Sequence, residues 1–132
     1  MSKYEKIELT NMCMIYDNNG NVLVQDKINK SWGGITFPGG HIEKQESFVD
    51  SVIREVKEET NLEIGELKLF GAADDIQPDR HYITLHIIAK KHRGELKVME
   101  PTKEDRWEWF DLDKLPQNLY SPSKKFIEEY LK

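Results

Sequence analysis

The chain has 132 residues, of which 38% are hydrophobic and 33% are charged. These proportions are typical of a soluble globular protein, and the length fits one domain, residues 1–132, rather than two. The formal net charge of −5 and the lack of any Lys/Arg run longer than a pair disfavour a nucleic-acid polymer as partner. A small polyphosphate remains compatible with this charge if a divalent cation mediates the contact.

Cys13 is the only cysteine, so one chain can form neither a disulfide nor a thiolate metal site. Its position in the apolar run 12–16 predicts that it is buried. Residues 1–10 lack signal-peptide character, and no stretch approaches the roughly 20 apolar residues that a membrane span requires. We therefore expect a cytoplasmic protein without a membrane partner, either a monomer or a homodimer.

Residues 7–25 predict a β-hairpin. A run rich in β-branched and apolar residues, 7–16, is followed by turn-forming residues at 17–21, and the apolar pattern resumes over residues 22–25. Asp, Asn and Gly favour a tight turn, so we expect the two runs to pair.

A loop, a short strand and a helix come next. Residues 27–34 are polar with paired glycines, as in a loop, and residues 35–37 before the turn at 38–40 predict a short strand. Residues 47–60 have the strongest helix pattern in the chain, because apolar residues recur at helical spacing without an interrupting Gly or Pro.

The second half of the chain predicts three strands and one more helix. Strand patterns cover residues 66–76 and 82–90, and a turn follows at 93–95. A short strand at 107–111 places its two tryptophans on one face, and a helix over 122–131 closes the chain. The order of elements predicts an α/β (α+β) sandwich with a mixed β-sheet between helices.

A helical wheel of residues 47–60 places glutamates beside the apolar face. The residues of that face are Phe48, Val49, Val52, Ile53 and Val56. At about 100° per residue, Glu55 and Glu59 border or enter the face, whereas Glu58 lies farther round the helix. Carboxylates in such positions are costly unless they are paired or bind a metal ion, so they indicate a functional site. The oxygen donors suit Mg²⁺ or Mn²⁺, and the alternative is a helix whose charges are merely solvated.

Residues 40–62 match a known motif. Gly40 is followed after five residues by Glu46, after seven more by Arg54-Glu55-Val56-Lys57-Glu58-Glu59, and after one more by Asn61-Leu62. This segment resembles the Nudix box, Gly-x5-Glu-x7-Arg-Glu-U-x-Glu-Glu-x-Gly-U, in which U is aliphatic. It departs from the motif only at Asn61, which replaces glycine. We expect little loss there, because Asn tolerates the left-handed conformation that ends a helix.

The resemblance implies the Nudix α/β/α sandwich and a Mg²⁺-dependent hydrolase of a nucleoside diphosphate linked to another moiety, X. By the resemblance, the metal ligands would be Glu55, Glu58, Glu59 and the carbonyl of Gly40. Either Glu58 or a carboxylate outside the box would activate the water, and Glu46 and Arg54 would orient these groups. Mn²⁺ could replace Mg²⁺.

Segments outside the box are similar to nucleoside triphosphate diphosphatases, and residues 32–41 are similar to those of the bacterial MutT type. The similar segments are residues 32–41, 81–84, 94–95, 100–101 and 107–109. They imply a nucleoside triphosphate substrate, such as 8-oxo-dGTP or another deoxynucleoside triphosphate. The products would be the nucleoside monophosphate and pyrophosphate.

Residues near the box are candidates for substrate contacts. They are Trp32, Phe37, Gly39, His41, His81, Tyr82 and Asp105. Trp32 would stack on the base or pack in the core. His41 would contact phosphate, stabilise the turn or cap the helix. His81 and Tyr82 would contact the base or pack at the edge of the sheet.

Glu104 and Asp105 precede the strand predicted at 107–111. Acidic residues in this late loop are candidates for the catalytic base or a further metal ligand, and Glu104 is included in the catalytic set for that reason. The alternative is a solvated pair of loop side chains.

The function has alternatives in two classes. Within enzymes, ADP-ribose and dinucleoside polyphosphates are possible substrates, and no residue favours either; mRNA cap removal would predict a basic RNA track, which the net charge of −5 disfavours. Outside enzymes, a catalytically silent Nudix domain could sense nucleotides. The intact Glu55, Glu58 and Glu59 argue against a sensor, which has no need for mutually repelling carboxylates.

Overall fold

The computed structural model of the protein describes residues 7–17, 19–26, 35–99, 106–111 and 126–128. Its elements in chain order are β1 (Ile7–Ile15), β2 (Asn21–Asp26), β3 (Ile35–Thr36), β4 (Gly39–His41), α1 (Phe48–Thr60), β5 (Glu63–Ile76), β6 (His81–Arg93) and β7 (Trp107–Asp111). Residues 126–128 are also helical. The predicted loop at 27–34 and most of the predicted helix at 122–131 lie outside the described residues. No helix in the described ranges is long and apolar enough to cross a membrane.

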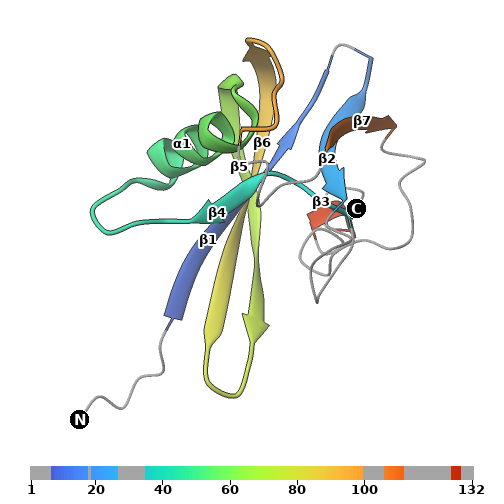
Figure 1. Cartoon of the computed structure of the whole chain (residues 1–132). Helices are drawn as coiled ribbons and strands as arrows, with labels where there is room; N and C mark the ends of the chain where they lie inside the picture. Colours follow the sequence, from blue (N-terminus) through green and yellow to red (C-terminus); the bar gives the residue numbers. More distant parts are fainter. Residues whose placement is uncertain (1–6, 18, 27–34, 100–105, 112–125, 129–132) are drawn as a thin grey trace.

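Two sheets form the centre of the fold. The larger has the strand order β4-β1-β6-β5; its β1 and β6 are parallel, and its other neighbours are antiparallel. The smaller sheet, β3-β2-β7, is antiparallel. Figure 1 shows α1 on one side of the larger sheet and the smaller sheet on the other. The predicted mixed sheet and the α+β class are confirmed, and the strands β5 and β6 extend farther than predicted.

The prediction of a hairpin over residues 7–25 is wrong for most of its length. The two strands meet only in the bridge between Tyr16 and Val22, and then enter different sheets. The reason is that β1 is a central strand: β4 occupies one of its edges and β6 the other, so neither edge is left for β2. Residues Asn11–Ile15 are accordingly buried on both faces, which explains why this segment is apolar without alternation.

The core has one cluster on each face of the larger sheet. On the α1 side, Cys13 and Ile15 pack with Val52 and Val56 of the helix. On the opposite side the cluster consists of Met12, Met14, Val22, Val24, Phe37, Ile88, Phe126 and Ile127. Each fully buried side chain of this size contributes about 1.5–3 kcal/mol. Cys13 is buried as predicted, and burial raises the pKa of its thiol.

Helix α1 confirms the pattern predicted at residues 47–60. Ser47 is the N-cap, and its side-chain oxygen accepts a hydrogen bond of 3.0 Å from the backbone N–H of Asp50. Asn61 ends the helix in the left-handed conformation, with φ 69°, and its N–H donates to the carbonyl of Lys57. Asn61 therefore adopts the conformation that glycine adopts readily, as predicted from the box.

The buried face of α1 is rotated from the predicted one. Phe48, Val49 and Ile53 are 37–39% exposed, whereas the buried positions are Ser51, Val52, Val56 and Thr60. The helix packs against β4 as well as β1 and β5, and this turns Glu55 and Glu59 toward the protein. The two carboxylates thus enter the packed face, which is one of the two predicted positions.

Gly39 has no room for a side chain. A Cβ at this position would overlap the backbone carbonyl of Asn11 on the neighbouring strand, which cannot move without breaking the sheet. We expect Gly39→Ala to lower the free energy of unfolding by about 3 kcal/mol, the upper end for overpacking. Chemical denaturation measures this loss.

The matched control is Gly65→Ala, because a Cβ at Gly65 meets nothing within 4 Å among the described residues. This variant is expected to stay within about 0.5 kcal/mol of the wild type. Equal stability of the two alanine variants would contradict the close approach of β4 to β1.

Candidate functional site

The site forms where helix α1 lies against strand β4. Glu55 projects from the helix toward Gly40, and a Cβ on Gly40 would lie 2.5 Å from the carboxyl carbon of Glu55. The side chain of Glu55 is only 17% exposed. The glycine therefore admits a half-buried carboxylate that any other residue would displace.

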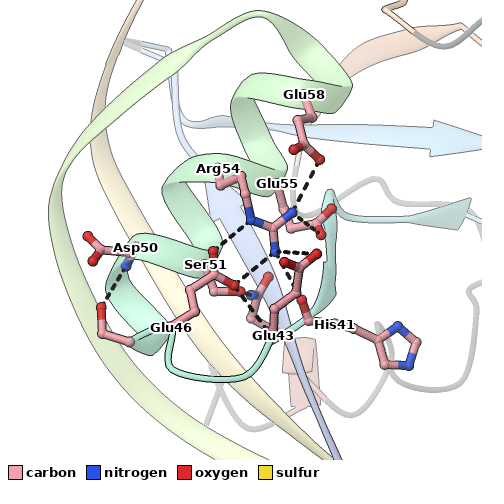
Figure 2. A network of polar contacts seen from close by, with 10 residues as sticks. His41, Glu43, Glu46, Asp50, Ser51, Arg54, Glu55 and Glu58 are labelled. Carbon is pink, nitrogen blue, oxygen red and sulfur yellow. Dashed lines mark hydrogen bonds and ion pairs between the residues drawn. The ribbon is translucent and has the colours of Figure 1, made fainter.

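Arg54 gathers the acidic side chains of the box around its guanidinium group (Figure 2). Its Nε and Nη2 donate to the two carboxylate oxygens of Glu46 at 2.7 and 2.9 Å. Its Nη1 donates to Glu55 at 2.9 Å and to Glu58 at 3.2 Å. The bidentate pair with Glu46 fixes the plane of the guanidinium, which in turn sets the position of the other two carboxylates.

The same contacts shift the titration of the Glu46–Arg54 pair. Hydrogen bonds from Arg54, together with the backbone N–H of Glu43, lower the pKa of Glu46 to about 2. The hydrogen bonds to Glu46, and then those to Glu55, raise the pKa of Arg54. Both groups stay charged over the whole physiological range, so the pair is a permanent ionic clamp.

Glu59 connects the helix to the turn that precedes it. Its Oε1 accepts a hydrogen bond of 2.9 Å from the backbone N–H of Gly39, and its backbone carbonyl accepts one of 3.2 Å from the indole N–H of Trp107. The carboxylate thus holds the Gly39–Gly40 segment against α1. The turn, the helix and strand β7 are joined at this residue.

The donor set fits a hard divalent cation in its chemistry. Glu55, Glu58 and Glu59 carry carboxylate oxygens, and Gly40, which lies close to the carboxyl group of Glu55, has a backbone carbonyl. In the described part of the chain, no three or more His, Cys, Asp or Glu side chains converge on one point as a metal site would require. Two of the glutamates instead contact Arg54, a cation with which a metal ion would compete for the same oxygens.

The residues predicted to contact substrate do not all lie near helix α1. Trp32, Glu104 and Asp105 lie outside the described residues. Phe37 is buried in the core, edge-on to Phe126 with ring centroids 5.6 Å apart. Its side chain therefore packs inside the protein.

His41 does not cap the helix, because Ser47 occupies the N-cap position. Its ring is 66% exposed, points away from Arg54 and lies 3.6 Å from Glu8, whereas its backbone carbonyl accepts a hydrogen bond of 3.2 Å from Arg54 (Figure 2). The main chain of His41 therefore belongs to the clamp. The imidazole lies beside Glu8 and does not take part in the clamp.

His81 and Tyr82 point to opposite faces of the sheet. Tyr82 pairs in register with Glu8 and Thr84 with Thr10, and the hydroxyls of the two threonines lie 2.8 Å apart. These four side chains form a polar extension of the face on which Met12 and Met14 are buried, here called the polar sheet face.

His81 lies on the α1 face, where its Nε2 is 2.6 Å from Asp74.

Sequence reasoning missed two residues of the site, Asn11 and Ser51. Both are buried, and the side-chain amide of Asn11 donates to the hydroxyl of Ser51 at 2.7 Å. An asparagine within an apolar strand is unfavourable unless its amide is paired, and this could have marked Asn11. A helical wheel could have marked Ser51, because it places this polar residue on the same helix face as Glu55.

The comparisons with known proteins identify the family. A family model described as the NUDIX domain matches residues 8–130. The chain therefore belongs to the Nudix family. It is a Nudix hydrolase, an enzyme that acts on pyrophosphate bonds.

Two curated relatives and one solved structure show what the chain is similar to. It is 34% identical over 121 residues to the ADP-ribose pyrophosphatase of Methanocaldococcus jannaschii, an alignment that covers 90% of this chain and 70% of the relative. It is 29% identical over 137 residues to an mRNA-decapping enzyme subunit 2 of Saccharomyces cerevisiae, of which the chain spans only 13%. The crystal structure of a MutT NUDIX hydrolase from Burkholderia pseudomallei superposes with a TM-score of 0.86 and 26% identity, over 95% of this chain and 98% of that one.

The low pKa of Glu46 predicts a change of stability with pH. Because its pKa falls from 4.5 to about 2 on folding, its contribution is present above pH 4.5 and is lost as the pH falls toward 2. Glu46→Gln is expected to flatten the dependence of the melting temperature on pH across this window. Thermal unfolding between pH 2 and pH 7 measures it.

Glu66→Gln is the matched control, because Glu66 is about half exposed on strand β5 and pairs with Lys91 at 3.2 Å. It should keep the pH dependence of the wild type. If the melting temperature of Glu46→Gln depended on pH as that of the wild type does, the clamp would not form in solution.

Proposed function

We propose that the protein is a Mg²⁺-dependent hydrolase of nucleoside diphosphates linked to a second moiety, with Mn²⁺ as a substitute. The observation that carries the proposal is the half-buried carboxylate of Glu55 against Gly40, next to Glu58 and the Glu46–Arg54 clamp. Three carboxylates on one helix repel one another, and a cation bound with a diphosphate relieves this repulsion.

The roles of the residues follow from their positions. Glu55, Glu58, Glu59 and the Gly40 carbonyl would hold the cation. When bound, the cation neutralises charge on the diphosphate and lowers the pKa of water. Glu58 is more than half exposed, so it is free to turn from Arg54 and accept the proton of the attacking water. Water oxygen bonds to phosphorus, the P–O bond of the anhydride breaks, and the leaving phosphate carries away the bonding electrons.

The nucleoside is assigned to the polar sheet face. Thr10 of this face pairs with His41 on β4, and Tyr82 pairs with Glu8 from the other side of β1. At the edge of this face, His41 lies 3.6 Å from Glu8. Hydroxyl and carboxylate groups there can bind ribose and the edge of a base. This assigns substrate contacts to His41 and Tyr82 but not to His81, which lies on the α1 face.

Two substrate classes are supported by different observations. The archaeal relative, an ADP-ribose pyrophosphatase at 34% identity, favours ADP-ribose. The segments at 32–41 and 81–84 and the fold match to a MutT NUDIX hydrolase favour a nucleoside triphosphate, with 8-oxo-dGTP among the candidates. A catalytically silent nucleotide sensor is disfavoured, because it would gain nothing from the box glutamates.

A screen of substrates with Mg²⁺ decides between them. The panel contains ADP-ribose, normal and oxidised nucleoside triphosphates, dinucleoside polyphosphates and capped RNA. ADP-ribose should give AMP and ribose 5-phosphate, whereas a triphosphate should give the monophosphate and pyrophosphate, and chromatography of the products distinguishes the two. Glu58→Gln is expected to abolish turnover, and Glu66→Gln to leave it unchanged. If no compound were hydrolysed, the proposed Mg²⁺-dependent hydrolase activity would be contradicted.

Gly40→Ala distinguishes an effect on catalysis from an effect on stability. The added methyl meets the carboxyl end of Glu55, which is flexible, so it is expected to displace this side chain at a stability cost under about 1.5 kcal/mol. Turnover should fall by about 10- to 100-fold, as when the support of a metal ligand is removed. Steady-state kinetics together with thermal unfolding measure both effects.

Gly65→Ala is again the control, and it should retain both stability and turnover. Full activity in Gly40→Ala would show that the contact between Gly40 and Glu55 is unimportant for catalysis.

A further inference from the structure

A buried hydrogen bond joins the centre of the sheet to the box helix. The amide of Asn11, 3% exposed on β1, donates to the hydroxyl of Ser51 on α1 at 2.7 Å, and Ser51 is fully buried. The two residues are 40 positions apart in sequence. A directional bond at this depth fixes the rotation and the height of the helix over the sheet, which apolar contacts alone would leave adjustable.

The helix that this bond anchors also carries Arg54 of the ionic clamp. The backbone N–H of Ser51 also donates to the carbonyl of the N-cap residue Ser47 at 2.9 Å, so Ser51 lies in the first turn of the helix. Glu46 holds Arg54, and Arg54 holds Glu55 and Glu58. The bond from Asn11 to Ser51 therefore anchors the same helix that carries Arg54, Glu55 and Glu58.

Asn11 also positions the Gly39–Gly40 segment, which lies against helix α1. It pairs in register with Gly40, and its carbonyl is the group that excludes a side chain at Gly39. One residue thus positions the turn through its backbone and the helix through its side chain. Neither Asn11 nor Ser51 occupies a defined position of the Nudix box.

We propose that Asn11 and Ser51 are positioning residues that set the geometry of the metal-binding glutamates on helix α1. This inference rests on the proposed function, in which Glu55 and Glu58 bind the cation. The pair acts by holding the helix in register with Gly40, and neither side chain contacts the substrate or the cation itself.

The test measures Mn²⁺ binding to the substrate-free protein by electron paramagnetic resonance. Ser51→Ala and Asn11→Ala are each expected to raise the dissociation constant for Mn²⁺ by about 10-fold, as for groups that support metal ligands. The double variant should be no weaker than the weaker single variant, because both remove the same bond. The two single variants are independent, so either one alone tests the proposal if the other does not fold.

Thr60→Val is the control for a purely structural effect. Thr60 is fully buried on the same helix, and its hydroxyl donates to the carbonyl of Val56 at 2.7 Å. This variant is expected to lower the melting temperature and to keep the Mn²⁺ affinity of the wild type.

The outcomes distinguish the two proposals. Unchanged Mn²⁺ affinity in Ser51→Ala and Asn11→Ala, or an equal loss in Thr60→Val, would overturn the positioning role while leaving the proposed function in place. A wild-type protein that binds no Mn²⁺ would overturn both. Weaker binding confined to the Asn11 and Ser51 variants supports the proposal.

Discussion

Strand β4 lies close to both strand β1 and helix α1 because residues 39 and 40 carry no side chain. At Gly39 the space is taken by the backbone of β1, and at Gly40 by the carboxyl group of Glu55. The remaining features of the site depend on this close approach. It brings the N–H of Gly39 within reach of Glu59 and the main chain of His41 within reach of Arg54.

Arg54 resolves the electrostatic problem that this packing creates. The approach of helix and turn places several carboxylates in a small, partly buried volume, where like charges repel strongly. One guanidinium bonds three of them, Glu46, Glu55 and Glu58. Glu46 takes the bidentate position and is shielded, whereas Glu58 is the most exposed of the three. This ordering suits a site in which one carboxylate is fixed and another is free to exchange partners.

The alternation of residues along β1 divides its side chains between the two faces of the larger sheet. On β1, odd-numbered residues face α1 and contribute Asn11 and Cys13 to the side that carries the box helix. Even-numbered residues contribute Met12 and Met14 to the opposite core and, nearer the start of the strand, polar side chains to the open part of that face. The same alternation explains why the side chains of His81 and Tyr82, adjacent in sequence, lie on opposite faces of the sheet.

The sequence alone determined the class of the fold, the helix at 47–60, the left-handed end at Asn61 and the acidic box, because these depend on local periodicity and on a motif of fixed spacing. Only the tertiary structure decided the rest. The pairing of β1 with β4 and β6 displaced the expected hairpin, and packing against β4 rotated the helix so that Glu55 and Glu59 face inward. The bond between Asn11 and Ser51 joins residues far apart in the chain. No local pattern encodes such a contact, since it arises only when the sheet brings the two elements together.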